Sequence, residues 1–221
     1  MQVLAPQGNF SSSRCLVSGE LGNVAGMGGT GTLKAVLFDR DGTLVVDVPY
    51  NGNPQLVRPM DSARSALEQV RRAGLATGVL SNQSGVARGL LTLNQVHAVN
   101  RRVEELLGPF DVWEICPHGP ADGCTCRKPA PGMILAACST LGLHPSQVAF
   151  VGDIGADVEA ATAAGSRSVL VPTHVTRSEE IEAAGVVAEN LLAAVGLLLD
   201  AATGTTGGEF PKPDARQDSP V

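Results

Sequence analysis

Apolar residues follow two different patterns along this chain. Five short runs are continuous rather than alternating and are bounded by polar turns, which is typical of strands buried on both faces of a parallel sheet; they cover residues 34–38, 76–80, 111–115, 148–151 and 168–171. Helical spacing of apolar residues separates them, at 63–70, 92–107, 133–141 and 158–164, and a last helical run covers 191–199. Alternating strands and helices predict a doubly wound, Rossmann-like α/β fold with at least five parallel strands.

The two ends of the chain differ from the segment between them. Residues 1–32 are rich in Ser, Gly and Asn, and residues 201–221 combine Gly, Pro and polar residues; neither shows helical or strand periodicity. We therefore expect a flexible N-terminal arm (1–32), a single globular domain (33–200) and a disordered C-terminal tail (201–221).

Charge and hydropathy exclude several classes of function. The 221 residues carry a net charge of −6 without a basic cluster that would bind nucleic acid. No apolar run reaches the eighteen or so residues that a membrane span needs, and the start of the chain lacks the pattern of a secretory signal. We expect a cytoplasmic monomer whose partner is a small molecule, with no nucleic-acid or membrane partner.

Carboxylates follow two of the predicted strands, at the edge of the sheet where ligands bind in such folds. Asp39 and Asp41 leave the first strand two residues apart, so both can face one pocket, and Gly42 allows a sharp turn behind them. Asp153 and Asp157 follow the fourth strand. Several acids around one crevice require a cation, and oxygen-only ligands favour Mg²⁺.

Polar residues that suit phosphate follow the second strand. Ser81, Asn82, Gln83 and Ser84 offer hydroxyl, amide and backbone N–H groups, and Lys128 further along the chain adds positive charge. Each piece alone could be an ordinary turn or helix cap. Together they supply a nucleophile, an acid, a hydroxyl, a lysine and a metal-binding carboxylate to one site.

Three cysteines and a histidine lie within eleven residues, at Cys116, His118, Cys124 and Cys126. Three thiolates and one imidazole suit a closed tetrahedral Zn²⁺ site, which would be structural because the protein fills all four positions. The alternatives are a strained Cys124–Cys126 disulfide and an accidental cluster.

These motifs together resemble the haloacid-dehalogenase superfamily of phosphatases, over roughly residues 33–200. The resemblance implies that Asp39 is a nucleophile forming an aspartyl-phosphate and that Asp41 is the acid and base. It also implies that Ser81 and Lys128 hold the transferring phosphoryl group. Mg²⁺ would be held by Asp39, Asp153 and the backbone carbonyl of Asp41, with Asp157 orienting the neighbouring groups.

The short segments between the motifs leave no room for a cap domain, as in the capless subfamily IIIA. Residues 81–89 and 116–133 resemble enzymes that act on D-glycero-D-manno-heptose 1,7-bisphosphate and their relatives that act on histidinol phosphate. By that resemblance the substrate would contact Asp47, Tyr50, Ser81, Asn82, Gln83, Ser84, Arg127 and Lys128. Val45 departs from the heptose pattern, which leaves histidinol phosphate and other sugar phosphates as alternative substrates. A non-catalytic zinc-stabilised binding protein is a further alternative, since fold does not imply function.

Overall fold

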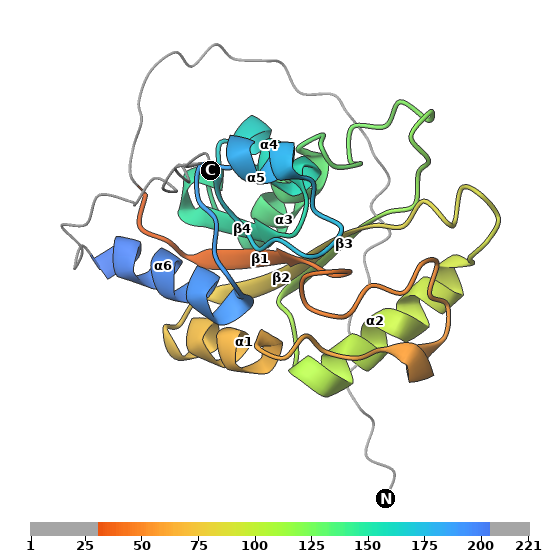
Figure 1. Ribbon diagram of the computed structural model, residues 1–221, viewed down its shortest axis with the longest axis horizontal. Helices are drawn as coiled ribbons and strands as arrows, with labels where there is room; N and C mark the ends of the chain where they lie inside the picture. The colour runs from red at the N-terminus through yellow and green to blue at the C-terminus, as the bar shows by residue number, and fades with distance from the viewer. Residues whose placement is uncertain (1–30, 204–221) are drawn as a thin grey trace, which may run out of the picture.

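Five parallel strands form the centre of the structure, a computed structural model that describes residues 31–203 (Figure 1). The strands are β1 (Ala35–Asp39), β2 (Ala76–Asn82), β3 (Val112–Cys116), β4 (Val148–Gly152) and β5 (Arg167–Leu170), in the spatial order β3-β2-β1-β4-β5. All five predicted strands are therefore confirmed, as is the doubly wound fold. Residues 1–30 of the predicted arm and residues 204–221 of the predicted tail lie outside the described residues.

Helices cover both faces of the sheet (Figure 1). One face carries α1 (Ala63–Arg72), α2 (Leu93–Leu107) and α6 (Leu191–Thr203), and the other carries α3 (Gly132–Leu141) and α4 (Gly155–Ala164), with α5 (Ser178–Ala183) beside α4. Alternate side chains of β1 enter the two cores, Val36 and Phe38 on the first face and Ala35 and Leu37 on the second. Within residues 31–203, no helix has the length and hydropathy that crossing a membrane demands.

The strand order places a crevice beside the end of β1. From β1 the chain proceeds to β2 and β3 on one side, then crosses to β4 and β5 on the other side. Loops that follow β1 and β4 therefore diverge to opposite faces, and a ligand can enter between them. The carboxylates that follow these two strands meet at this point.

Two helices differ from the sequence-based expectation. The α4 helix begins at Gly155, three residues before the predicted start, because the Asp157 carboxylate accepts hydrogen bonds from the backbone N–H groups of Asp153 and Ile154 and closes the first turn. The α5 helix was not predicted, since its six residues, SEEIEA, are too few to show an apolar period. In contrast, the capping box at the start of α2, between Thr92 and Gln95, is confirmed.

The connections that could hold a cap domain are short. Between β1 and α1 lies a loop with one 3-10 helix, η1 (Pro54–Leu56), and between β3 and α3 the chain forms neither a helix nor a strand. A second 3-10 helix, η2 (Pro145–Gln147), precedes β4 on the opposite side of the fold from the strand ends. Within residues 31–203, these connections therefore hold no cap domain over the mouth of the crevice, as expected.

Candidate active site and metal centre

The first carboxylate of the site, Asp39, is the last residue of β1 and is buried, with 7% of its surface exposed. Behind it Gly42 adopts a φ of 84°, a left-handed conformation that glycine adopts without strain. A Cβ atom on Gly42 would lie 2.3 Å from Oδ2 of Asp153. Glycine thus lets the loop after β1 press against the carboxylate that follows β4.

Lys128 connects the two acidic loops. Its Nζ lies 2.5 Å from Oδ1 of Asp39 and 2.7 Å from Oδ1 of Asp157, and all three side chains are buried. Burial alone would lower the pKa of Lys128, but the carboxylates of Asp157 and Asp39 outweigh it and raise that pKa. Burial raises the pKa of Asp39 well above its usual value, although Lys128 opposes this effect.

Asp153 and Asp157 have different environments at the end of β4. Asp157 accepts hydrogen bonds from the backbone of Asp153 and Ile154, at 3.1 and 3.2 Å, and is thus fixed in the first turn of α4. Asp153 accepts a hydrogen bond of 3.2 Å from Oγ1 of Thr43. Burial, followed by the charge of Asp157, raises the pKa of Asp153 to about 7.

Three carboxylates could share a cation. Oxygen atoms of Asp39, Asp153 and Asp157 all lie within 4.8 Å of one another. One lysine cannot neutralise three carboxylates, and burial, with the neighbouring carboxylates adding to it, raises the pKa of both Asp39 and Asp153. Oxygen donors of this kind fit a hard divalent ion such as Mg²⁺, with Asp157 already committed to Lys128 and the backbone.

The second carboxylate of the first motif, Asp41, is held from several directions. Oδ2 accepts hydrogen bonds from Nε2 of Gln83 at 2.9 Å and from Oγ of Ser81 at 3.4 Å, and it forms an ion pair of 2.9 Å with Nη2 of Arg40. Gln83 also donates to Ser81 at 2.7 Å. The predicted phosphate-binding residues Ser81 and Gln83 therefore contact Asp41, the residue predicted to act both as acid and as base.

Asn82 connects β2 to the loop of the lysine. Its amide donates to the backbone carbonyl of Lys128 and accepts from the backbone N–H of Lys128, both at 3.1 Å. This pair of hydrogen bonds fixes the backbone from which the lysine side chain extends. Asn82 was predicted to bind substrate; it lines the pocket beside Asp41, and its amide contacts the lysine loop.

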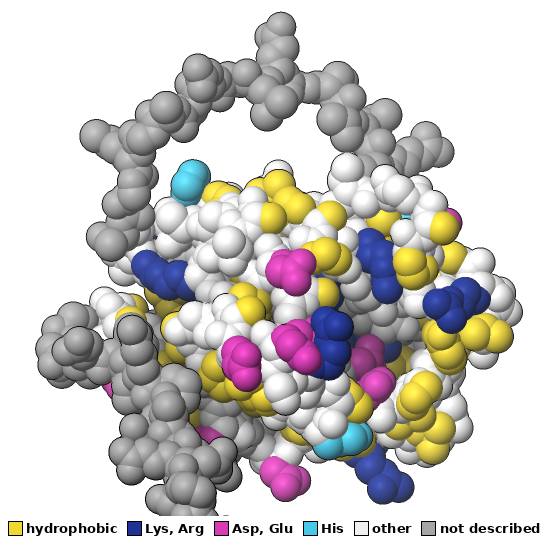
Figure 2. All heavy atoms as spheres, turned by 45° about the horizontal axis from the view of Figure 1, so that its top comes forward, with side chains coloured by type: hydrophobic (Ala, Val, Ile, Leu, Met, Phe, Trp, Pro, Cys, Tyr) yellow, Lys and Arg dark blue, Asp and Glu magenta, His cyan; other side chains and the backbone are white. Residues whose placement is uncertain are grey.

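A pocket of about 140 Å³ opens beside Asp41. It is lined by four of the predicted substrate contacts besides Asn82, namely Asp47, Tyr50, Gln83 and Ser84. Figure 2 shows acidic side chains in a hollow of this face with basic side chains around them. Arg127 is not among the residues that line this pocket; its Nη1 donates to the backbone carbonyl of His118 at 3.4 Å.

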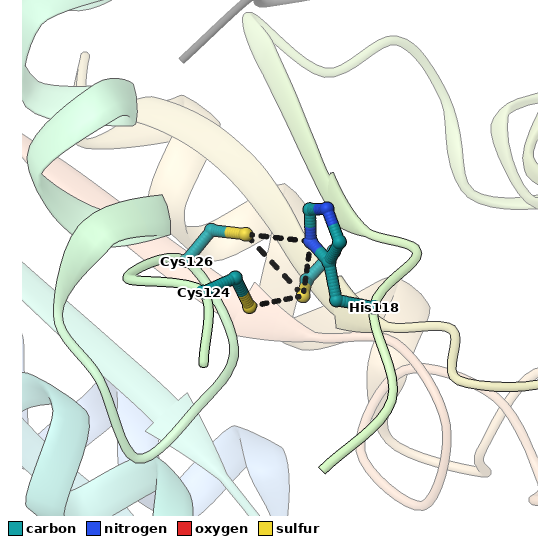
Figure 3. A group of neighbouring side chains, drawn as sticks. His118, Cys124 and Cys126 are labelled. Atoms are coloured by element: carbon teal, nitrogen blue, oxygen red, sulfur yellow. Dashed lines mark hydrogen bonds between the residues drawn. The ribbon is translucent and has the colours of Figure 1, made fainter. Parts of the chain in front are cut away.

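The cysteine loop brings its four donor atoms together (Figure 3). Nδ1 of His118 lies 3.2 Å from Sγ of Cys126 and 3.6 Å from Sγ of Cys116, and the latter sulfur lies 3.4 Å from Cys126 and 3.7 Å from Cys124. A tetrahedral zinc with usual bond lengths would separate such donors by roughly 3.5 to 3.8 Å. The four side chains therefore fit one tetrahedral ion, bound through Nδ1 of the histidine.

The alternative of a disulfide is not found. Cys116, Cys124, Cys126 and Cys138 are the cysteines of the described part of the chain, and all four are free thiols. Cys116 is fully buried at the end of β3 and belongs to the core under α3, so the cluster is fastened to the sheet. Cys138 lies on α3 and takes no part in the cluster.

Sequence reasoning missed two buried residues that contact the site, Arg40 and Asn100. Nη1 of Arg40 donates to Oδ1 of Asn100 at 2.6 Å, while the rest of the guanidinium contacts Asp41. Asn100 lies on the buried face of α2 with Val99 and Val103. A polar residue among the regularly spaced apolar positions of that helix was the sequence signal that could have predicted this contact.

Known proteins share the sequence and the fold. Residues 125–194 match the model of the HAD-hydrolase-like family, where HAD stands for haloacid dehalogenase. The D-glycero-beta-D-manno-heptose-1,7-bisphosphate 7-phosphatase of Pseudomonas putida is 38% identical over 146 residues, which are 64% of this chain and 83% of that enzyme. This chain belongs to the haloacid-dehalogenase-like phosphatases.

Further members of this phosphatase family are similar to the chain in sequence and in structure. The enzyme of the same name from Escherichia coli K12 is 34% identical over 174 residues, covering 73% of this chain and 91% of that enzyme. The crystal structure of D,D-heptose 1,7-bisphosphate phosphatase from B. bronchiseptica, complexed with magnesium and phosphate, superposes with a TM-score of 0.68. It is 29% identical and covers 76% of this chain and 99% of that one.

Proposed function

We propose that this phosphatase removes the 7-phosphate of D-glycero-D-manno-heptose 1,7-bisphosphate with the aid of Mg²⁺. The observation that carries the proposal is the meeting of Asp39, Lys128 and Asp153 in one buried cluster, with Asp41 and the pocket beside it. A protein that only bound a ligand on this fold would have little need for this set. The names of the relatives support the choice of the sugar.

In the first step, a carboxylate oxygen of Asp39 forms a bond to phosphorus as the bond from phosphorus to the sugar oxygen breaks. Asp41 donates a proton to that oxygen, so that the sugar leaves as an alcohol. Ser81 and Lys128 hold the transferring phosphoryl oxygens, and the buried ammonium group of Lys128 offsets their charge.

In the second step, water attacks phosphorus and the bond to Asp39 breaks, which releases inorganic phosphate. Asp41 accepts the proton of the water and is ready for another cycle. The same group thus serves as acid and then as base, which requires its carboxyl to stay beside the reacting oxygen in both steps.

Mg²⁺ and Zn²⁺ have separate roles in this proposal. Asp39, Asp153 and the backbone carbonyl of Asp41 would hold Mg²⁺, which supplies positive charge against the repulsion between carboxylate and phosphate. The magnesium and phosphate in the B. bronchiseptica relative support this assignment. Zn²⁺ on the cysteine loop would be structural and would fix the backbone of Arg127 and Lys128, which directly follow Cys126.

The sugar would lie in the pocket against Asp47, Tyr50 and Ser84, with Arg127 reaching it from the cysteine loop. The departure at Val45 does not weaken this assignment. Its side chain is only 3% exposed and belongs to the core beside α1, and Val45 does not line the pocket, although its backbone pairs with Asp41, which does. The partner of the protein is then a small phosphorylated metabolite.

A substrate panel tests the choice of sugar. Phosphate release is measured with heptose 1,7-bisphosphate, histidinol phosphate and simple hexose phosphates at equal Mg²⁺. We expect kcat/KM to be at least about tenfold higher for the heptose, a difference of about 1.4 kcal/mol in transition-state binding. Comparable low rates on all substrates would contradict the heptose assignment, and a preference for histidinol phosphate would replace it.

The raised pKa of Asp153 predicts a pH dependence of Mg²⁺ binding. This carboxyl binds the cation only when ionised, and a pKa of about 7 means that protons compete with Mg²⁺ below that pH. The dissociation constant for Mg²⁺ should rise by roughly tenfold for each pH unit below 7 and be nearly constant above about pH 8. Calorimetric titration between pH 5.5 and 8.5 measures this, and a constant affinity down to pH 5.5 would contradict it.

A further inference from the structure

The residue between the two aspartates of the first motif, Arg40, is directed into the protein. It is only 1% exposed, although arginine is rarely buried without a partner. Its Nε lies 3.2 and 3.1 Å from the two carboxylate oxygens of Asp41, and its Nη2 lies 2.9 Å from Oδ2. The planar guanidinium thus meets its neighbour's carboxylate along an edge.

The backbone around Arg40 explains this arrangement. After β1 the chain turns back so that the N–H groups of Leu44 and Val45 both donate to the carbonyl oxygen of Arg40, at 3.0 Å each. A residue held in such a turn cannot move without opening both hydrogen bonds. The backbone from which the guanidinium extends is therefore fixed.

The other end of the guanidinium is fixed by α2. Nη1 donates to Oδ1 of Asn100 at 2.6 Å, and Asn100 is 1% exposed on the buried face of that helix. The Nδ2 atom of Asn100 is buried without a hydrogen-bond partner, which is costly for a core amide. An unsatisfied buried group of this kind needs a compensating role, and its visible contact in the structure is the one to Arg40.

We infer that Arg40 and Asn100 form a positioning pair that holds the carboxyl group of Asp41 for proton transfer to the leaving oxygen. The inference rests on the proposed function, in which Asp41 is the acid. Proton transfer needs the donor within about 3 Å of the leaving oxygen and correctly oriented. Arg40 contacts both oxygens of the carboxylate and Gln83 donates a further hydrogen bond to Oδ2, so the group is oriented before substrate binds.

A comparison of two leaving groups tests the pair. An alkoxide needs a proton as it leaves, whereas p-nitrophenolate is stable as an anion at neutral pH and depends little on an acid. In Arg40→Lys, which keeps the charge but loses the planar fork, and in Asn100→Ala, kcat/KM for the sugar phosphate should fall at least about tenfold. For p-nitrophenyl phosphate the fall should be less than about threefold. The sugar phosphate is heptose 1,7-bisphosphate, or the alkyl phosphate with the highest rate in the substrate panel.

Two further variants separate this inference from the proposed function and from a structural effect. Val99→Ala removes a neighbouring core side chain of α2 and should leave the ratio of the two kcat/KM values unchanged. Asp41→Asn should show the same dependence on the leaving group, only larger. Suppose that Asp41→Asn shows this dependence but that kcat/KM in Arg40→Lys and in Asn100→Ala falls equally for both substrates. The positioning role is then overturned, while the acid role of Asp41 stands. If kcat/KM of Asp41→Asn falls equally for the sugar phosphate and for p-nitrophenyl phosphate, Asp41 is not the acid, and the positioning role of Arg40 and Asn100 is overturned with it.

Discussion

Asp39→Asn is expected to lower Mg²⁺-dependent phosphate release by at least about three orders of magnitude, because the variant lacks the proposed nucleophile. An amide oxygen attacks phosphorus poorly and does not form the acyl-phosphate that water would hydrolyse. The fold should persist, since asparagine has the shape of aspartate and Lys128 keeps its ion pair of 2.7 Å with Asp157. Burial already disfavours the charge of Asp39, so a neutral side chain is tolerated there.

Phosphate release and circular dichroism on the same preparations measure this prediction. Asp61→Asn is a matched control, since Asp61 is exposed in the turn before α1 and belongs neither to the pocket lining nor to the carboxylate cluster. It should keep the rate of the wild type. Undiminished turnover by a well-folded Asp39→Asn protein would contradict the mechanism.

Cys124→Ser is expected to lower the melting temperature by roughly 10 °C and to remove the bound zinc. Zinc binding contributes to folding free energy, and loss of about 3 kcal/mol shifts the melting temperature of a protein of this size by about 6 to 12 °C. Below the melting temperature of the variant, phosphatase activity should be affected less than stability, because Asn82 still holds the backbone of Lys128 through two hydrogen bonds. Metal analysis and thermal unfolding, with and without a chelator, provide the measurements.

Cys138→Ser is the control for a cysteine of the core that lies outside the cluster. It should lose some stability through the buried hydroxyl group while retaining zinc and the response to chelator. The proposed zinc site would be ruled out if the wild-type protein contained no zinc and melted at the same temperature as Cys124→Ser, with no change in that temperature when a chelator is added.

The sequence predicts the sheet well because its signals are local. A strand buried on both faces needs a continuous apolar run, and β1 and β4 show this plainly with the stretches AVLFD and VAFVG. In a parallel sheet, residues that directly follow such runs share one edge. The convergence of Asp39 with Asp153 therefore followed from their order along the chain.

Contacts that depend on side-chain direction could not be predicted in this way. Gln83 follows β2 as a phosphate ligand would, but the turn after the strand directs its amide to Asp41. Arg40 and Asn100 are 60 residues apart, and their contact depends on how α2 is rotated against the sheet. The packing of the whole buried face of α2 in the core determines that rotation.

The cysteine loop has one more consequence, for how proteins of this architecture can diverge. The donors Cys116 and Cys126 stand at its two ends, and between His118 and Cys124 the residues 120–123 are exposed. Insertions or deletions at this tip would leave the donors, Arg127 and Lys128 where they are, because the sheet and Asn82 hold both ends. The tip can therefore change length while the reaction centre is inherited unchanged.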